Sequence, residues 1–317
     1  MVALSVSHVI TDAAGVVILL QQWSSLALQL PKDNSDASKN LQPNFPVDFD
    51  HMKFWRNLKQ YPSAAHPFAQ YVNKQEIGSV DEVNATLANF YKNGSIGKGE
   101  LETYMLCVSA SNIARISAQF NSFDKRPLHG VQILYALIWQ RFLAAVIQNN
   151  PVDLNEPAHL NFLHNIRSLV SSPYYVGNGV STACIVSTID KVISMQTIDL
   201  AYKIKMHLNS LTPGAVVHLA ESVIDPKNMF MQKAVCISSK AASILSLSNA
   251  SKMPFYDIDF GLGRPETVLC STLPTENMLS WLPSEDGGVV INAGIRKDLY
   301  LRLKQDKILN EFIDFAN

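Results

Sequence analysis

Residues 2–30 read VALSVSHVITDAAGVVILLQQWSSLALQL and predict a short strand, a polar loop and a long amphipathic helix. His8 stands at the end of the expected strand, and Asp12 follows four residues later, where the helix begins. A histidine between two packed elements has a fixed position and an open side, as an acid or base catalyst requires. His8 is therefore a candidate catalytic residue. The alternative is a structural histidine beside an aspartate that only caps the helix. The expected apolar face of the helix is Val16, Leu19, Leu20, Trp23, Leu26, Ala27 and Leu30.

The composition limits the function classes. A chain of 317 residues with 47% hydrophobic and 17% charged residues is long enough for two domains or one large one. Its net charge of −1 excludes a global electrostatic footprint for nucleic acid or an anionic membrane. Residues 15–30 form the longest apolar stretch, and glutamines and serines interrupt it, so it is too short and too polar to span a bilayer. We expect a cytoplasmic monomer.

Neither the cysteines nor the histidines predict a metal site. The four cysteines are widely spaced and lack a C-x-x-C pair: Cys107, Cys184, Cys236 and Cys270. Three of them lie in apolar, β-like runs, which favours buried thiols in a reducing compartment. No two histidines have zinc-site spacing with a third ligand. We expect the histidines other than His8 to be structural.

The rest of the chain alternates between expected helices and strands. Residues 31–50 predict a surface loop, followed by short helical turns in a connector. Helices are expected over 109–121, 126–150, 196–211 and 297–315, and strands over 159–166, 180–189 and 287–295, with a further apolar segment at 233–238. This alternation predicts an α/β sandwich.

A second motif, Asp259-Phe260-Gly261-Leu262-Gly263, is followed by Arg264-Pro265. Taken alone, it predicts a strand that ends in a turn permitted by glycine. It contains no nucleophile and no phosphate-loop spacing. A protein kinase is excluded, because no glycine-rich loop, V-A-I-K lysine or H-R-D loop precedes the D-F-G.

Together, HVITDAAG and DFGLGRP resemble the HxxxD and DFGWG motifs of the BAHD acyltransferase superfamily, which uses acyl-coenzyme A (CoA). Asn165-Ile166-Arg167 followed by Tyr175-Val176-Gly177-Asn178 is similar to the family's N-x-R … Y-F-G-N segment, and residues 132–139 resemble its helix ending in Ile-Trp. The similarity covers nearly all of the chain, with four motifs in the family's order. Leu262 and the following Arg264-Pro265 look more like the fungal branch, nearest to the trichothecene 3-O-acetyltransferase group.

The resemblance implies a two-domain fold like that of chloramphenicol acetyltransferase, with mixed sheets flanked by helices. Family members carry a sizeable segment ahead of HxxxD, so we expect this chain to be truncated at its amino terminus, with an incomplete first domain. Residues 1–50 would be the remnant of that domain, 51–95 the crossover connector and 96–317 the second domain. Residues 261–284 would pack back on the first domain.

The resemblance also implies a reaction and a site. An acyl group, expected to be acetyl, would pass from acyl-CoA to a hydroxyl or amine of a small molecule of secondary metabolism, with His8 as general base. Asp12 would pair with Arg167 instead of orienting His8. Asp259, Gly261 and Gly263 would be structural. Oxyanion donors would be Ser248 and Asn249, and CoA phosphates would meet Lys233, Lys240 and Lys252.

Two alternatives remain open at this stage. The chain could be a catalytically impaired family member that binds acyl-CoA or a small ligand without turnover. It could also be a thioesterase-like hydrolase, which would need a nucleophile or carboxylate beside His8. The sequence shows no G-x-S-x-G elbow.

Overall fold

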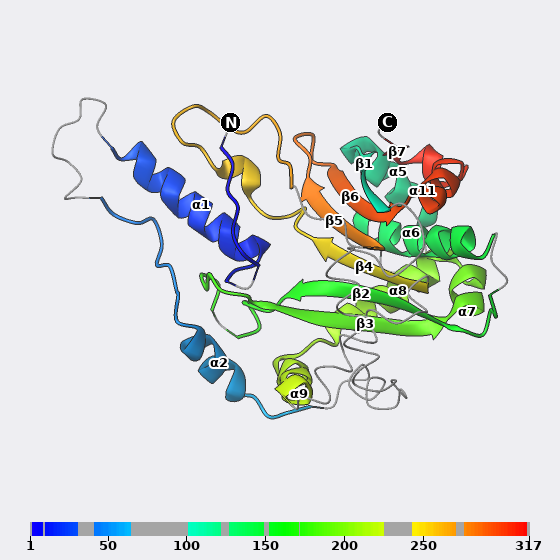
Figure 1. Cartoon of the computed structure of the whole chain (residues 1–317), viewed down its shortest axis with the longest axis horizontal. Helices are drawn as coiled ribbons and strands as arrows, with labels where there is room; N and C mark the ends of the chain where they lie inside the picture. Colours follow the sequence, from blue (N-terminus) through cyan, green and yellow to red (C-terminus); the bar gives the residue numbers. More distant parts are fainter. Residues whose placement is uncertain are drawn as a thin grey trace.

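The computed structural model describes residues 2–8, 10–30, 41–64, 101–121, 127–148, 152–170, 172–224, 243–270 and 276–315. In this part of the chain, one seven-stranded sheet has the order β3-β2-β4-β5-β6-β1-β7, with helices packed on it (Figure 1). The strands are β1 (Leu101–Val108), β2 (Pro157–Asn165), β3 (Val180–Thr188), β4 (Ile244–Asn249), β5 (Met278–Pro283), β6 (Val289–Arg296) and β7 (Asp314–Phe315). The helices are α1 (Ala13–Leu28), α2 (His51–Lys59), α5 (Ala110–Phe120), α6 (Gly130–Ile147), α7 (Ile189–Ser194), α8 (Thr197–Asn209), α9 (Pro213–Ile224) and α11 (Lys297–Lys304), with 3-10 turns η3 (Phe255–Asp257) and η4 (Leu309–Glu311).

The sheet is mixed, and its parallel strands define the edge at which the site lies. β4 runs parallel to both β2 and β5, whereas the other neighbouring pairs are antiparallel. Because β2 and β4 are parallel, their carboxyl ends meet at the same edge of the sheet. The amino-terminal segment and α1 lie beside this edge (Figure 1).

Helix α6 forms the centre of the core on one face of the sheet. The expected helix 126–150 is confirmed as Gly130–Ile147, and fourteen of its residues are buried. The ring of Tyr135 packs edge-on against Phe162 of β2 and Trp281 of β5, with centroids 5.2 and 5.0 Å apart. Burial raises the pKa of Tyr135 to about 12. The helix has the length and hydropathy of a membrane span, but 78% of it is buried inside the protein, as in the core helix of a globular domain.

Several predicted elements are confirmed. α5 and α8 lie within the predicted helices 109–121 and 196–211, and β2, β3 and β6 match the predicted strands. α5 begins at Ser109, whose side chain accepts from the backbone N–H of Asn112. The mixed α/β fold with a sheet flanked by helices is the predicted fold class. The apolar segment 233–238 lies outside the described residues.

Four predictions about elements were wrong or incomplete. Residues 2–7 form no strand, since no described strand hydrogen-bonds to them. The last helix ends at Lys304, because the Asp306 carboxylate accepts from the N–H groups of Ile308 and Leu309 and turns the chain. No strand leads directly into Asp259, because the nearest one, β4, ends at Asn249. The strands β1, β4 and β5 were not predicted.

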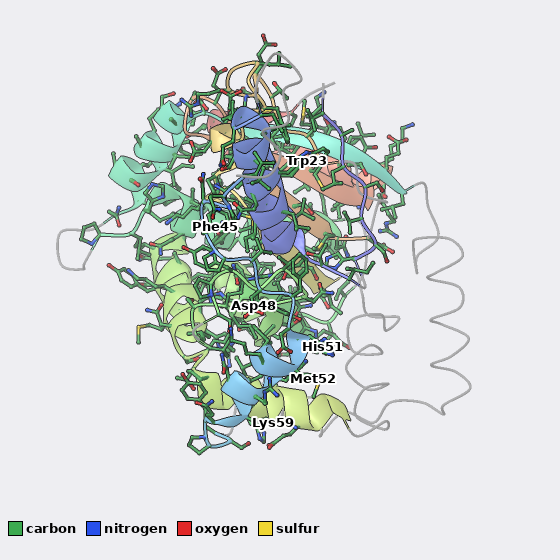
Figure 2. All side chains as sticks on the ribbon, turned by 90° about the vertical axis from the view of Figure 1, so that its left-hand side faces the viewer. Trp23, Phe45, Asp48, His51, Met52 and Lys59 are labelled. Atoms are coloured by element: carbon green, nitrogen blue, oxygen red, sulfur yellow. The ribbon has the colours of Figure 1, made fainter. Side chains whose placement is uncertain are left out.

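The buried face of α1 differs from the predicted one. Trp23 and Leu30 of the predicted face are 55% and 51% exposed, whereas the buried residues are Ala14, Gly15, Val17, Ile18, Gln22, Ser24 and Ser25. Gln22 is buried because its amide donates to the backbone carbonyl of Phe45 at 2.6 Å and accepts from the N–H of Asn44 at 3.2 Å. Figure 2 shows α1 crossing this side of the molecule, with Phe45 and Asp48 next to it on the way to α2.

The domain division stays a prediction. All strands of the described sheet come from residues 101–315, and the connector 51–95 contains α2, with residues 65–95 outside the described part of the chain. Phe260 does contact α1, because its ring meets that of Trp23 at 5.2 Å. The expectation that residues 261–284 pack back on the first domain also stays a prediction, and residues 278–283 lie within this segment. They form β5, hydrogen-bonded between β4 and β6.

Candidate functional site

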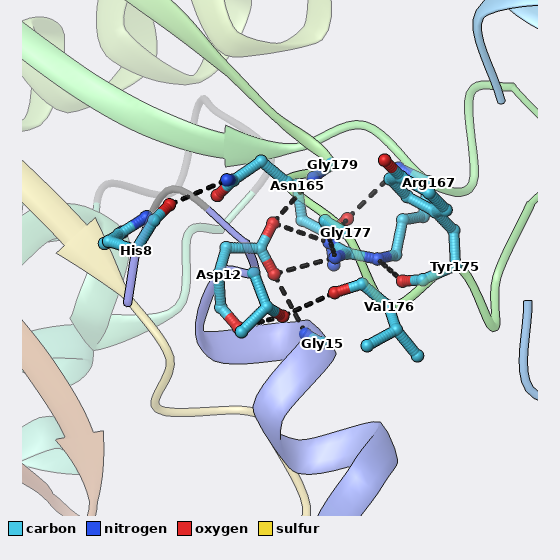
Figure 3. A network of polar contacts seen from close by, with 11 residues as sticks. His8, Asp12, Gly15, Asn165, Arg167, Tyr175, Val176, Gly177 and Gly179 are labelled. Carbon is cyan, nitrogen blue, oxygen red and sulfur yellow. Dashed lines mark hydrogen bonds and ion pairs between the residues drawn. The ribbon is translucent and has the colours of Figure 1, made fainter. Parts of the chain in front are cut away.

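Asp12 is the centre of a buried network of polar contacts (Figure 3). Its side chain is 4% exposed, and one carboxylate oxygen accepts from the backbone N–H of Gly15 at 2.9 Å, which caps α1. The same oxygen accepts from Nη2 of Arg167 at 2.7 Å. The other oxygen accepts from Nη1 of Arg167 at 3.0 Å and from the N–H of Gly179 at 2.7 Å. The helix cap and the expected ion pair are therefore both present, and they use the same carboxylate.

Arg167 uses all five of its N–H donors in this cluster. Besides the two bonds to Asp12, Nε donates to the carbonyl of Tyr175 at 2.6 Å and Nη2 donates to that of Gly177 at 2.6 Å. Nη1 also donates to the side-chain oxygen of Asn165 at 3.2 Å. A buried ion pair is stable only when its remaining donors and acceptors are satisfied, and here they are. The guanidinium thereby joins the end of β2, the β2–β3 link and the start of α1.

Glycine at position 15 allows the helix to approach the β2–β3 link. A Cβ on Gly15 would lie 2.0 Å from the carbonyl oxygen of Val176 and 2.1 Å from Oγ1 of Thr11. Thr11 Oγ1 itself donates to that carbonyl oxygen through a short hydrogen bond. The first turn of α1 is therefore pressed against residue 176, and a side chain at position 15 has no room.

His8 lies on a turn just before this cluster, and its side chain is exposed. The turn is closed by a hydrogen bond from the N–H of Ile10 to the carbonyl of Ser7 at 2.9 Å. The carbonyl of His8 accepts from the side-chain amide of Asn178 at 2.7 Å. The loop lies beside the carboxyl ends of β2 and β4 (Figures 1 and 3).

Asp12 cannot orient the imidazole of His8. Its two oxygens are engaged by Arg167 and by two backbone N–H groups, and it is buried among them. A Ser-His-Asp type of triad, in which the acid contacts the histidine ring, is therefore not formed by this pair. The imidazole of His8 therefore has no carboxylate partner in Asp12.

Tyr175 and α2 support the cluster from behind. The ring of Tyr175 stacks on Phe54 of α2 at 4.4 Å between centroids, and Arg167 Cζ lies 5.8 Å from the centroid of the Tyr175 ring. Residue 48 pairs with the same segment, since its N–H donates to the carbonyl of Tyr174 and its carbonyl accepts from the N–H of Val176. The predicted connector therefore includes residues that hold the site in place, which sequence reasoning missed.

The DFGLG segment forms a separate loop. One oxygen of Asp259 accepts from the N–H groups of Gly261, Leu262 and Gly263 at 2.7, 3.0 and 2.9 Å. Gly261 and Gly263 have φ values of +90° and +94°, which a residue with a side chain rarely adopts. Leu262 at the loop tip is 91% exposed. Asp259 organises its own loop, in agreement with a structural role.

The two predicted oxyanion donors point to opposite faces of the sheet. Consecutive side chains of a strand point to opposite faces of the sheet. The amide of Asn249 donates to the hydroxyl of Tyr135 on α6 through a short hydrogen bond, so Asn249 faces α6. The Asn249 side-chain oxygen accepts from the N–H of Ser251 at 2.8 Å. Ser248 is half-buried and lies near the end of β4, on the face opposite α6. Of the two, only Ser248 lies on the accessible face.

The remaining candidates are less informative. Lys252 is exposed, and Lys233 and Lys240 lie outside the described residues. Within the described ranges, no three histidine, cysteine, aspartate or glutamate side chains gather as a metal site would require.

Cys184 is buried and Cys107 is half-buried, but Cys270 is exposed, so the expectation of a buried thiol was wrong at that position. A cavity of about 570 Å³ lies away from His8, on α5, and is lined by Ala110, Ile113, Ala114, Ser117, Ala118, His129 and Gly287.

Comparison with protein families identifies one match over most of the chain. The profile of the Transferase family matches residues 1–298. Stemmadenine O-acetyltransferase of Catharanthus roseus is 23% identical over 322 residues, covering 100% of this chain and 64% of the relative. The chain therefore spans somewhat less than two thirds of the length of this curated relative.

Solved structures share the fold. F. graminearum TRI101 complexed with coenzyme A and deoxynivalenol superposes with a TM-score of 0.70 at 16% identity, covering 97% of this chain and 66% of that one. Vinorine synthase superposes with a TM-score of 0.63 at 16% identity, covering 98% of this chain and 62% of that one. At this identity, the similarity establishes the mixed α/β fold.

Proposed function

Because the chain belongs to the Transferase family, that of the BAHD acyltransferases, we propose that it transfers an acyl group from acyl-CoA to a small molecule. The acceptor is a hydroxyl or an amine, and His8 is the general base. The observation that carries this proposal is that two features occur on one loop. His8 is exposed, and the carboxylate of Asp12, four residues later, is engaged by Arg167 and by backbone N–H groups. The histidine is open to a substrate, while the residue four positions later holds its loop.

The reaction follows from this arrangement. One ring nitrogen of His8 takes the acceptor proton as the acceptor oxygen or nitrogen attacks the thioester carbonyl carbon. The resulting tetrahedral oxyanion needs a hydrogen-bond donor, and Ser248 is the candidate because it lies on the accessible face at the end of β4. The carbon–sulfur bond then breaks, and the imidazolium returns the proton to the leaving thiolate, giving free CoA and an ester or amide. A positioned base contributes typically ~10²–10⁴-fold to such a rate.

Finer features of the proposal are supported by the relatives. A relative named as an O-acetyltransferase supports acetyl-CoA as donor and a hydroxyl as acceptor. Leu262 in the DFGLG motif, followed by Arg264-Pro265, supports a place in the fungal branch near the trichothecene acetyltransferase group. We extend the proposal to a cytoplasmic monomer of secondary metabolism, with Lys233, Lys240 and Lys252 as candidates to meet the CoA phosphates.

The test is thiol release from acetyl-CoA in the presence of a panel of alcohols and amines, with mass detection of the acylated product. His8→Ala should lower the rate by about 10²–10⁴-fold. The matched control is His51→Ala, because His51 is also exposed but lies on α2. It should keep the wild-type rate.

The outcomes separate the alternatives. Equal thiol release from wild type and His8→Ala would exclude His8 as the base. Thiol release without an acylated acceptor would indicate a thioesterase-like hydrolase. Binding of acetyl-CoA with no thiol release from any acceptor would favour the non-catalytic alternative.

A further inference from the structure

Asn178 joins the histidine itself to the body of the protein. It lies between Gly177 and Gly179 in the β2–β3 link, and its side-chain amide donates to the main-chain carbonyl of His8 at 2.7 Å. Further contacts between this link and the loop are made at Thr11 and Asp12, three and four residues farther along the chain. Asn178 is half-buried and His8 is exposed, so the bond lies at the surface of the protein.

The Asp12 cluster alone does not determine where His8 lies. Four residues of chain can reach about 13 Å when extended, so the loop could shift His8 by several ångströms while Asp12 stays in place. Residues 2–7, before His8, form no helix or strand. Of the contacts described here, the hydrogen bond from Asn178 restrains the backbone of His8 most directly.

We propose that Asn178 is a positioning residue for His8, whose side-chain amide fixes the histidine backbone at the carboxyl ends of β2 and β4. This inference rests on the proposed function of His8. Catalysis by a base depends on placement, and a displacement of about 1 Å can reduce a rate about 10²-fold. Loss of the amide donor should therefore slow the chemical step and leave binding of acetyl-CoA unchanged.

The experiment compares Asn178→Ala and Asn178→Asp with wild type at a temperature well below unfolding. Both variants remove the donor, and the aspartate keeps the shape of the side chain. We expect kcat for thiol release to fall about tenfold or more in both, with KM for acetyl-CoA within twofold of wild type. The matched control is Asn112→Ala, because the Asn112 amide also donates to a main-chain carbonyl, that of Phe312 at 2.9 Å, on the far side of the sheet. It should leave kcat unchanged.

Two further arms identify the target of Asn178. In the first arm, Asn178→Ala is introduced into the His8→Ala variant and both proteins are assayed with added imidazole. Because the imidazole base diffuses freely, the rates of thiol release of the two proteins should differ by less than twofold. Hydrogen–deuterium exchange in residues 2–12 should accelerate in Asn178→Ala and not in Asn112→Ala, whether or not the protein turns over.

The inference is overturned if Asn178→Ala keeps the wild-type kcat and exchange, or if Asn178→Asp restores the rate. It is also overturned if Asn178→Ala slows the imidazole-rescued reaction as much as the wild-type one. Failure of the proposed function looks different, because His8→Ala would then equal wild type while exchange in residues 2–12 still responded to Asn178→Ala.

Discussion

The two motif loops of this protein are each organised by one aspartate, yet the two carboxylates act over very different distances along the chain. Asp12 bonds to Arg167, which is 155 residues away in the sequence, and to Gly179, which is 167 residues away. Asp259 accepts three backbone N–H groups that lie two to four residues after it. Asp12 therefore joins separate parts of the fold, whereas Asp259 shapes a single turn.

The glycines of the two loops differ in the same way. Gly15 is required because another segment occupies the space in which its Cβ would lie. Gly261 is required because its own backbone has φ near +90°, while the nearest atom to an added Cβ would be at an ordinary 3.6 Å. The HVITD loop depends on tertiary packing and the DFGLG loop on local conformation, so substitutions in the first should be the more damaging.

The largest expected effect is that of Arg167→Ala. It leaves the buried Asp12 carboxylate without its counter-charge, which costs about 3–5 kcal/mol of unfolding free energy. Thiol release should fall as well, because the His8 loop loses its anchor. Urea unfolding and the acetyl-CoA assay measure the two effects.

The control for Arg167→Ala is Arg56→Ala, since Arg56 forms an exposed pair with Asp50 at 3.3 Å. This change should cost less than about 1 kcal/mol. If Arg167→Ala were equally mild, the Asp12–Arg167 pair would not be the anchor of the loop.

Gly15→Ala should come next, with a loss of about 2–3 kcal/mol, because the new methyl group would overlap a backbone carbonyl that cannot move without displacing residue 176. Gly261→Ala should cost only about 1–2 kcal/mol, the strain of a positive φ. Denaturant unfolding of both variants gives the comparison. A greater loss at Gly261 than at Gly15 would reverse the distinction between the two loops.

A third expected effect depends on pH and arises in the sheet, away from both aspartates. Burial lowers the pKa of His159 from 6.5 to about 4. Between these values the unfolded chain binds more protons than the folded one, so stability is full above pH 6.5 and falls as the pH drops towards 4, by up to about 3 kcal/mol. His159→Leu should show a shallower loss over that pH window in urea unfolding. An unchanged pH dependence would remove His159 as its source.

The smallest expected effect is that of Asp259→Asn. Asparagine keeps an oxygen that can accept the same N–H groups, and these groups lie near the surface of the protein, so the loss should be below about 1 kcal/mol. A loss similar to that of Asp12→Asn, measured by the same urea titration, would show that Asp259 supports more than its own loop.

The sequence predicted the parts of this comparison that are local or carried by the family resemblance. The helix cap at Asp12 was the alternative to a functional His8–Asp12 pair, and the pairing of Asp12 with Arg167 followed from the family resemblance. The predicted face of α1 failed because the helix is apolar around most of its circumference, so periodicity could not choose a side. The orientation of the helix is instead fixed in part by Gln22, which is buried through its hydrogen bonds to the backbone of residues 44 and 45.

The missed features have two physical causes: a strand with an interrupted apolar pattern, and contacts between positions far apart in the sequence. Strand β4 was not predicted because its small hydroxyl side chains, Ser246 and Ser248, lie on the face opposite α6 and interrupt the apolar run. The contact of Asn178 with His8 joins positions 170 residues apart, and the stacking of Tyr175 on Phe54 joins the β2–β3 link to α2. A motif indicated that Asn178 belonged to the family pattern, but only the folded chain showed which group it contacts.

The most direct test of the long-range role of Asp12 is a double-mutant cycle between Asp12 and Arg167, with the free energy of unfolding measured for wild type, Asp12→Asn, Arg167→Gln and the double variant. If the two side chains form one buried unit, the losses should be strongly non-additive, with a coupling of at least about 2 kcal/mol. Losses that add to within about 0.5 kcal/mol would contradict the claim that this pair holds the His8 loop against the β2–β3 link.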